Sequence, residues 1–139
     1  MYQQHQELII ATRGRGLYDF TAEARAWLAG TQLSDGLLTL LVRHTSASLL
    51  IQENADIEVQ RDLERFFARL VPDGDPLFRH VSEGKDDMPA HVRAALTQTH
   101  LSIPFVRGEL ALGTWQGIYL YEHRSGGQRR SIMLHAIGA

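Results

Sequence analysis

A chain of 139 residues with 44% hydrophobic composition can bury a core of its own, so we expect a single domain over residues 1–139. A formal charge of −2 argues against nucleic acid or an anionic membrane as partner, and the absence of cysteine excludes disulfides, thiolate catalysis and sulfur-ligated zinc. No apolar run reaches the roughly 20 residues of a membrane helix, and the N-terminus lacks the features of a signal peptide, so we expect a cytoplasmic protein.

The first half of the chain predicts several strands and one short helix. The β-branched pair Ile9 and Ile10 marks the first strand, and the glycines at 14 and 16 predict a turn from which a second strand could return as a hairpin. Thr21 is an acceptable N-cap for a helix that runs to Gly30. Apolar runs then predict two adjacent strand segments. The expected strands are residues 3–12, 17–20, 36–44 and 46–54.

The second half predicts two helices and a β-rich end. Helical spacing indicates a helix capped by Asp56 that ends at Leu70. A long loop leads to a second helix, which has Pro89 in its first turn, runs to about His100 and has Asp86 or Asp87 available as its cap. The runs 117–124 and 129–138 predict a hairpin. This order of elements favours an α+β fold with a mostly antiparallel sheet.

Acidic and histidine side chains gather at the start of the helix that contains Pro89. Asp87 and His91 are four residues apart, so they share a helix face. Imidazole and carboxylate suit Zn²⁺, and carboxylates with water suit Mg²⁺. A histidine oriented by an aspartate could also act as general acid or base without metal. The simpler alternative is a capped helix with exposed acids. The polar residues of this segment are His80, Glu83, Asp86, Asp87 and His91.

Three further polar residues stand at the ends of apolar runs. His44 ends one run, and Glu53 with Asn54 closes the next. If the two runs are neighbouring strands, the end of one could meet the start of the other. The alternative is a hydrogen-bonded histidine, a solvated glutamate and a turn asparagine.

The segment GTWQG, residues 113–117, places two glycines around Thr114, Trp115 and Gln116. Such glycines allow a tight turn or the close approach of a ligand, although a β-bulge is the commoner explanation. The arginines after it, 124, 129 and 130, either form solvated pairs across a hairpin or grip a phosphate with two parallel hydrogen bonds.

Four segments together resemble the YjbQ-like family, described as secondary thiamine-phosphate synthases. They are HTSASLLIQENAD (44–56), EGKDDMPAH (83–91), SIPF (102–105) and LGTWQGIYLYEHR (112–124). The resemblance implies an α+β domain with a mostly antiparallel β-sandwich and two to three helices, which trimerises around a threefold axis, and a weak thiamine-phosphate synthase activity. The polar signature of the family falls on His44, Glu53, Asn54, His80, Asp86, Asp87, His91, Thr114, Trp115, Gln116 and Glu122, with Arg129 or Arg130.

These residues give a hypothesis for the function. The reaction joins a pyrimidine pyrophosphate to a thiazole phosphate, and a divalent cation, Mg²⁺ or Zn²⁺, or an arginine neutralises the departing pyrophosphate. The expected catalytic residues are His44, Glu53, Asp87 and His91. The expected metal ligands are His44, His80, Asp86 and His91. The expected substrate and phosphate contacts are Asn54, Thr114, Trp115, Gln116 and Arg130.

Two other functions fit the same residues. A metal-dependent hydrolase would act on a small phosphorylated metabolite without a second substrate, and a non-catalytic trimer would bind a metal or a small anion without turnover. For each of the three, we expect the histidine and carboxylate cluster to lie at or near a subunit boundary of a homotrimer.

Overall fold

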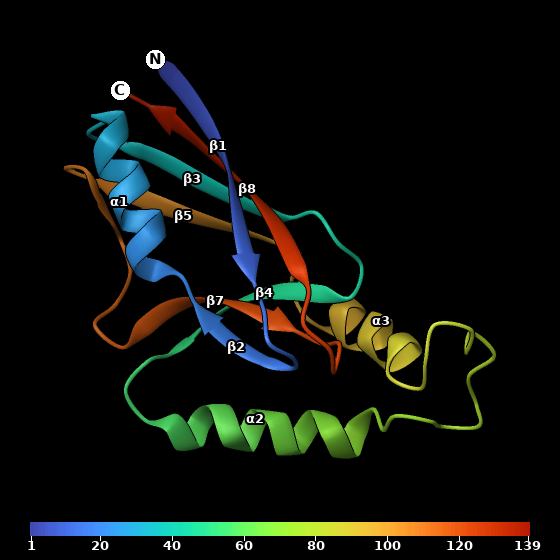
Figure 1. Ribbon diagram of the computed structural model, residues 1–139. Helices are drawn as coiled ribbons and strands as arrows, with labels where there is room; N and C mark the ends of the chain where they lie inside the picture. Colours follow the sequence, from blue (N-terminus) through green and yellow to red (C-terminus); the bar gives the residue numbers. More distant parts are fainter.

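The computed structural model describes all 139 residues and contains three α-helices and eight β-strands (Figure 1). In chain order they are β1 (Tyr2–Ala11), β2 (Gly16–Asp19), α1 (Thr21–Thr31), β3 (Gly36–Val42), β4 (Ala47–Glu53), α2 (Ile57–Leu70), α3 (Asp87–Leu96), β5 (His100–Val106), β6 (Glu109–Leu110), β7 (Gln116–Glu122) and β8 (Arg129–Gly138). The mixed α+β class with antiparallel sheets is confirmed. None of the helices has the length and apolar composition that crossing a membrane requires.

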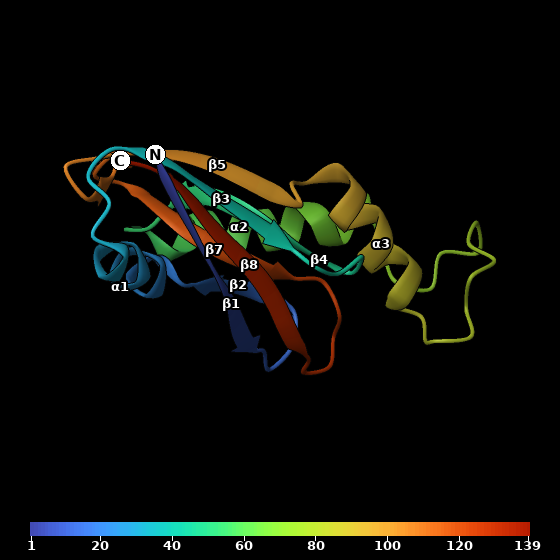
Figure 2. The same cartoon turned by 90° about the horizontal axis from the view of Figure 1, so that it is seen from above.

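The strands form two antiparallel sheets. The larger sheet has the order β1-β8-β3-β5-β6, and the smaller has the order β2-β7-β4. Side chains from both sheets enter one core, as Leu40 of β3, Leu49 of β4 and Leu134 of β8 illustrate. Helix α1 packs at one end of this core, and α2 runs beneath the smaller sheet, on the side away from the larger one (Figures 1 and 2). The smaller sheet therefore lies in the middle of the molecule.

The predicted hairpins are wrong because the consecutive strands belong to different sheets. β7 pairs with β2 and β4, whereas β8 lies between β1 and β3. Likewise, β2 pairs with β7 rather than with β1, and the expected neighbours β3 and β4 are separated. A strand's own residues show that it is extended, but its partner is decided by which surfaces it must bury. All but the first residue of β7 are buried, so this strand requires cover on both faces.

Helices α1 and α2 begin at or next to the predicted residues. Asp56 caps α2 because its carboxylate accepts a hydrogen bond from the Glu58 backbone N–H, at 2.9 Å. Helix α1 begins at Thr21, but Thr21 is not its cap: Asp19 accepts the hydrogen bond from the Thr21 backbone N–H instead. The same helix runs past Gly30 and ends where Gln32 adopts a left-handed conformation, with φ of 62°.

Helix α3 has the predicted N-cap residue, Asp86, but it is shorter than predicted. It ends at Leu96, and the carboxylate of Asp86, at the N-cap position, makes no capping hydrogen bond. The residues after Leu96 turn toward the sheets, where the carbonyl oxygens of Gln98 and Thr99 accept hydrogen bonds from the backbones of β4 and β3. These hydrogen bonds to distant strands hold residues 98 and 99 outside the helix. The local sequence does not reveal such long-range bonds, so the helix was predicted to run too far.

A buried ion pair lies where the two sheets meet. Glu122, the last residue of β7, pairs with Arg130 of β8, and their side chains are 0% and 5% exposed. Thr12 donates a second hydrogen bond to Glu122, at 2.7 Å, and Arg130 also donates to both oxygens of Ser46. Because both charges have several hydrogen-bond partners, their burial is compensated.

The neighbouring His123 generates a prediction about stability in acid. Its Nε2 lies 2.8 Å from Ser48 Oγ, and burial, followed by the charge of Arg93, lowers the pKa of His123 from 6.5 to about 3. The unfolded chain therefore binds a proton at a higher pH than the folded chain does. Stability from this residue is present above pH 6.5 and is lost as the pH falls toward 3, by up to about 1.4 kcal/mol per pH unit.

We expect the substitution His123→Gln to flatten this part of the pH dependence, as measured by urea unfolding between pH 4 and 7. The control His5→Gln changes an exposed histidine and should keep the wild-type slope. Equal slopes in His123→Gln and in the wild type would contradict the assignment.

Candidate metal centre

Three polar side chains converge around the buried carboxylate of Asp87. Asp87 Oδ2 lies 2.7 Å from His80 Nε2 and 3.2 Å from His91 Nε2. Glu83 Oε2 lies 3.3 Å from the same nitrogen of His80. One ligand atom from each of the four residues falls within 4.8 Å of all the others. The structure thus brings together two histidines and two acids of the predicted segment, and we call His80, Glu83, Asp87 and His91 the His–Asp cluster.

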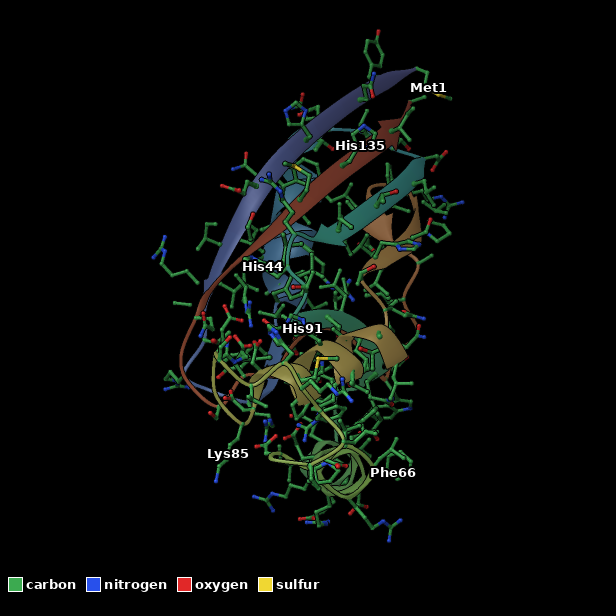
Figure 3. All side chains as sticks on the ribbon, turned by 90° about the vertical axis from the view of Figure 1, so that its right-hand side faces the viewer. Met1, His44, Phe66, Lys85, His91 and His135 are labelled. Atoms are coloured by element: carbon green, nitrogen blue, oxygen red, sulfur yellow. The ribbon has the colours of Figure 1, made fainter.

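The cluster combines a helix with a loop. Asp87 and His91 occupy one face of the first turns of α3, as their spacing predicts. His80 and Glu83 come from the loop of residues 71–86, which folds back so that the Gly74 backbone N–H donates to the Lys85 carbonyl, at 3.1 Å. Figure 3 looks at this side of the molecule, with His91 and Lys85 labelled.

The hydrogen bonds of His91 define which of its nitrogens carries a proton. Its Nδ1 lies 2.9 Å from the carbonyl oxygen of Thr45, which can only accept, so Nδ1 must donate. In the neutral ring the lone pair of Nε2 then faces the carboxylate of Asp87. Two lone pairs at this distance repel unless a proton or a cation lies between them. A backbone carbonyl that orients a histidine through Nδ1 is also a common feature of metal sites.

The charges of the cluster favour a cation. The hydrogen bond to Asp87 raises the pKa of His80. Partial burial opposes the ionisation of Asp87, but the hydrogen bond with His80 and the charges of His91 and Arg124 outweigh it and hold the pKa of Asp87 below its ordinary value. At neutral pH the cluster therefore contains an ionised carboxylate that either a proton or a metal ion can neutralise.

Arg124, which follows the end of β7, supports the cluster from behind. Its Nη1 lies 3.0 Å from Asp87 Oδ1, its Nε donates to Asp86, and its Nη2 donates to the backbone carbonyl of Glu83. Asp86 also accepts two hydrogen bonds from Ser125. Although partial burial acts in the opposite direction, these bonds hold the pKa of Asp86 well below its usual range. Asp86, an expected metal ligand, thus binds Arg124 and is not a member of the His–Asp cluster.

Sequence reasoning missed the role of Arg124. Because Arg124 follows a predicted strand, it was expected to form a solvated ion pair across a hairpin or to bind a phosphate. The fold instead places the end of β7 beside the start of α3, where Arg124 contacts Asp86 and Asp87. Glu83 was recognised as part of the segment but was not among the expected ligands. Its separation from Asp87 by four residues was the available signal.

Three of the expected site residues have structural contacts elsewhere. His44 Nε2 accepts a hydrogen bond from the Ser131 backbone N–H, at 2.8 Å, and burial lowers the pKa of His44. Glu53 accepts hydrogen bonds from the backbone at the entrance of α2. The guanidinium of Arg130 is enclosed with Glu122. Within this chain, none of the three is a member of the His–Asp cluster.

The remaining expected residues meet at the other end of β7. Asn54, Thr114 and Gln116 line a hollow of about 490 Å³, and Trp115 beside them is 63% exposed. Gln116 begins β7 and Arg124 follows its end, so about eight residues of extended chain, or roughly 25 Å, separate the two groups. Within one chain this hollow and the His–Asp cluster are separate places.

The contacts of Arg124 generate a prediction. Substitution Arg124→Gln removes the positive charge that orients Asp87, and we expect zinc affinity to fall by about 10- to 100-fold while the fold remains intact. The matched control, Arg79→Gln, changes an exposed arginine of the same loop that forms no ion pair with the cluster. Competition with a chromophoric chelator measures both affinities. Equal effects of the two substitutions would show that Arg124 does not support the cluster.

Comparisons with known proteins agree on one family. Residues 6–139 match the family described as UPF0047 protein YjbQ-like. A UPF0047 protein of Synechocystis sp. is 51% identical over 138 residues, which cover 99% of this chain and 94% of that protein. YjbQ of Escherichia coli O157:H7 is 46% identical over 127 residues, which cover 90% and 91% of the two chains.

Solved structures show the same fold. The crystal structure of a hypothetical protein from Aeropyrum pernix has a TM-score of 0.89 at 28% identity, covering 98% of this chain and 99% of that one. A conserved hypothetical protein from Thermus thermophilus has a TM-score of 0.85 at 33% identity, covering 95% and 99%. By sequence and by fold, the chain belongs to the YjbQ-like UPF0047 family.

Proposed function

We propose that this protein is an enzyme that uses a divalent metal ion, held by the His–Asp cluster, to act on a small phosphorylated metabolite. The observation that carries the proposal is the lone pair of His91 Nε2, which faces the Asp87 carboxylate because Nδ1 is committed to the Thr45 carbonyl. Two imidazole nitrogens with two carboxylates form a donor set that suits Zn²⁺. Mg²⁺ fits less well because it prefers oxygen ligands and retains several waters.

The first reaction that we propose is the thiamine-phosphate synthase reaction. The ring nitrogen of the thiazole phosphate forms a bond to the pyrimidine methylene carbon, while the bond from that carbon to pyrophosphate breaks and pyrophosphate leaves with the electron pair. A bound divalent cation supplies Lewis acidity to the phosphate oxygens. His80 would bind the metal through Nε2, the nitrogen that faces Asp87 and Glu83, so its Nδ1 carries the proton and can donate a hydrogen bond to the departing pyrophosphate.

A second reaction, hydrolysis of a small phosphate ester, is favoured by the shortage of free arginines. Arg124 is occupied by Asp86 and Asp87, and the guanidinium of Arg130 is buried. A pyrophosphate carries more negative charge than a monophosphate, so a site with few free cationic groups suits a monophosphate better. Glu83, whose side chain is 62% exposed, can accept a proton from the water that attacks phosphorus, while the ester P–O bond breaks and the alkoxide leaves with the electron pair.

The decisive experiment measures metal content and turnover together. We expect about one zinc per chain, and loss of both zinc and turnover, by at least about 100-fold, in His91→Ala and in Asp87→Asn. The control Asp62→Asn makes the same change at an exposed aspartate of α2, outside the cluster, and should retain both properties. Elemental analysis gives the stoichiometry, and phosphate and pyrophosphate release give the activity.

The outcomes distinguish the candidate functions. Pyrophosphate release that requires the thiazole phosphate supports transfer, and phosphate release from a single substrate supports hydrolysis. Stoichiometric zinc without turnover of either kind would support the non-catalytic binding protein instead. Wild-type protein that binds neither Zn²⁺ nor Mg²⁺ would refute the metal centre.

We also propose that three copies assemble around a threefold axis, as the resemblance to the family implies. The face of the larger sheet that points away from the core carries apolar side chains, among them Leu37 and Leu41, which are 37% and 46% exposed. In register beside them lie Ile137 and Met133 of β8. No helix covers this face (Figure 2), and identical neighbours in a closed ring would bury it.

A ring of this kind would also explain the separation of the expected site residues. A head-to-tail contact joins different surfaces of neighbouring chains. The hollow at Asn54, Thr114 and Gln116 could then approach the His–Asp cluster of the next chain, although the two lie at opposite ends of β7 within one chain.

The trimer yields a prediction for light scattering. We expect a mass three times that of the 15.6 kDa chain, and dissociation when Leu41→Glu places a charge on the apolar face. The control Leu70→Glu adds the same charge at an exposed position of α2, away from that sheet, and should leave the assembly intact. A monomeric wild type, or a Leu41→Glu protein of unchanged mass, would contradict this arrangement.

A further inference from the structure

The loop that precedes α3 encloses a hollow of about 370 Å³ beside the His–Asp cluster. Its apolar lining includes Phe78 and Val81 of the loop and Met88 of α3. His80 lines the same hollow while its Nε2 is bound to Asp87 in the cluster. The hollow and the cluster therefore share one side chain, and a small molecule in the hollow would be next to the polar atoms of the cluster.

The loop contains hydrogen bonds that shape this hollow. Its two limbs are joined by the bond from Gly74 N–H to the Lys85 carbonyl, and turns closed by the carbonyl oxygens of Asp75 and Val81 lie between them. Gly74 has a φ of 73°, a conformation that other residues rarely adopt, and the stem of Lys85 lies directly beside it. A loop of this length whose backbone is organised around a hollow is typical of a binding loop.

Lys85 supplies the positive charge of this hollow. It is the only lysine of the chain and is exposed at the surface (Figure 3). It also lines the hollow. The ion pairs around the loop join other residues and leave Lys85 without a partner. Asp75, the acid that lines the same hollow, accepts a hydrogen bond from the Leu77 backbone N–H instead. An ammonium group at the mouth of an apolar hollow is suited to an organic anion.

We infer that this hollow is the substrate subsite of the His–Asp cluster and takes a small organic phosphate with an apolar body about the size of one ring. The apolar body lies against Phe78, Val81 and Met88, and the phosphate lies between Lys85 and the cluster. This inference rests on the proposed metal-dependent function and specifies its substrate class. The volume is at the lower end of the range of small-molecule pockets, so the subsite excludes large nucleotides.

The test uses two phosphonates, which phosphate-ester hydrolysis does not consume. Calorimetry on the zinc-loaded protein compares phenylphosphonate with methylphosphonate, and we expect the phenyl compound to bind about tenfold more tightly because only its ring reaches the apolar lining. Substitution Lys85→Met keeps the stem but removes the charge, and phenylphosphonate affinity should fall by about tenfold with zinc affinity unchanged. Lys85→Arg, the matched control, restores most of the affinity.

Each outcome bears on the subsite separately from the metal. Equal affinities for the two phosphonates, or an unchanged affinity in Lys85→Met, would overturn the inference even if zinc binds and turnover is observed. If the wild type binds no metal, the proposed function fails, and the same titrations are made on the metal-free protein. Lys85-dependent preference for phenylphosphonate would then support the subsite alone, and its absence would refute the subsite as well.

Discussion

The carboxylate of Asp87 is the group on which the arrangement of the candidate site depends. It is 2% exposed and sits at the first residue of α3, where it faces two imidazoles and one guanidinium. A carboxylate so far removed from water is stable only if positive charge or hydrogen-bond donors surround it. Loop, helix and sheet each contribute such a group, through His80, His91 and Arg124. The requirement to compensate one buried charge thus joins three parts of the fold at a single place.

The position of Arg124 follows from the middle strand of the smaller sheet. β7 is buried on both faces, and its last residue, Glu122, is held by the buried pair with Arg130. The backbone N–H of Arg124 donates to Oε2 of Glu122, an oxygen that also accepts from Arg130, so the chain leaves the strand in a defined direction. The guanidinium then reaches the aspartates at the start of α3. The geometry of the cluster therefore depends on the buried Glu122–Arg130 pair between the sheets. This dependence gives a structural role to the buried polar residues at the end of β7.

Much of the helical structure could be predicted because its causes are local. The cap of α2 at Asp56 and the shared face of Asp87 and His91 depend on residues within one or two turns. Strand pairing was not predictable in this way. The order of the strands depends on which apolar faces meet across the core, and consecutive strands such as β7 and β8 entered different sheets. The end of α3 was misjudged for the same reason, since backbone bonds from Gln98 and Thr99 to distant strands ended the helix.

The sequence by itself determined the chemical character of the candidate site, because histidines and acids within a short segment at a helix entrance must lie near one another in any fold of that segment. It also determined the α+β class, through the periodicity of its apolar residues. Tertiary structure alone decided which polar residues converge. Glu53 and His44 bond to nearby backbone, Asn54 and Gln116 lie at the far end of β7, and Arg124 joins the cluster from a strand that is distant in sequence. Such long-range convergence depends on the packing of the sheets, which no local spacing encodes.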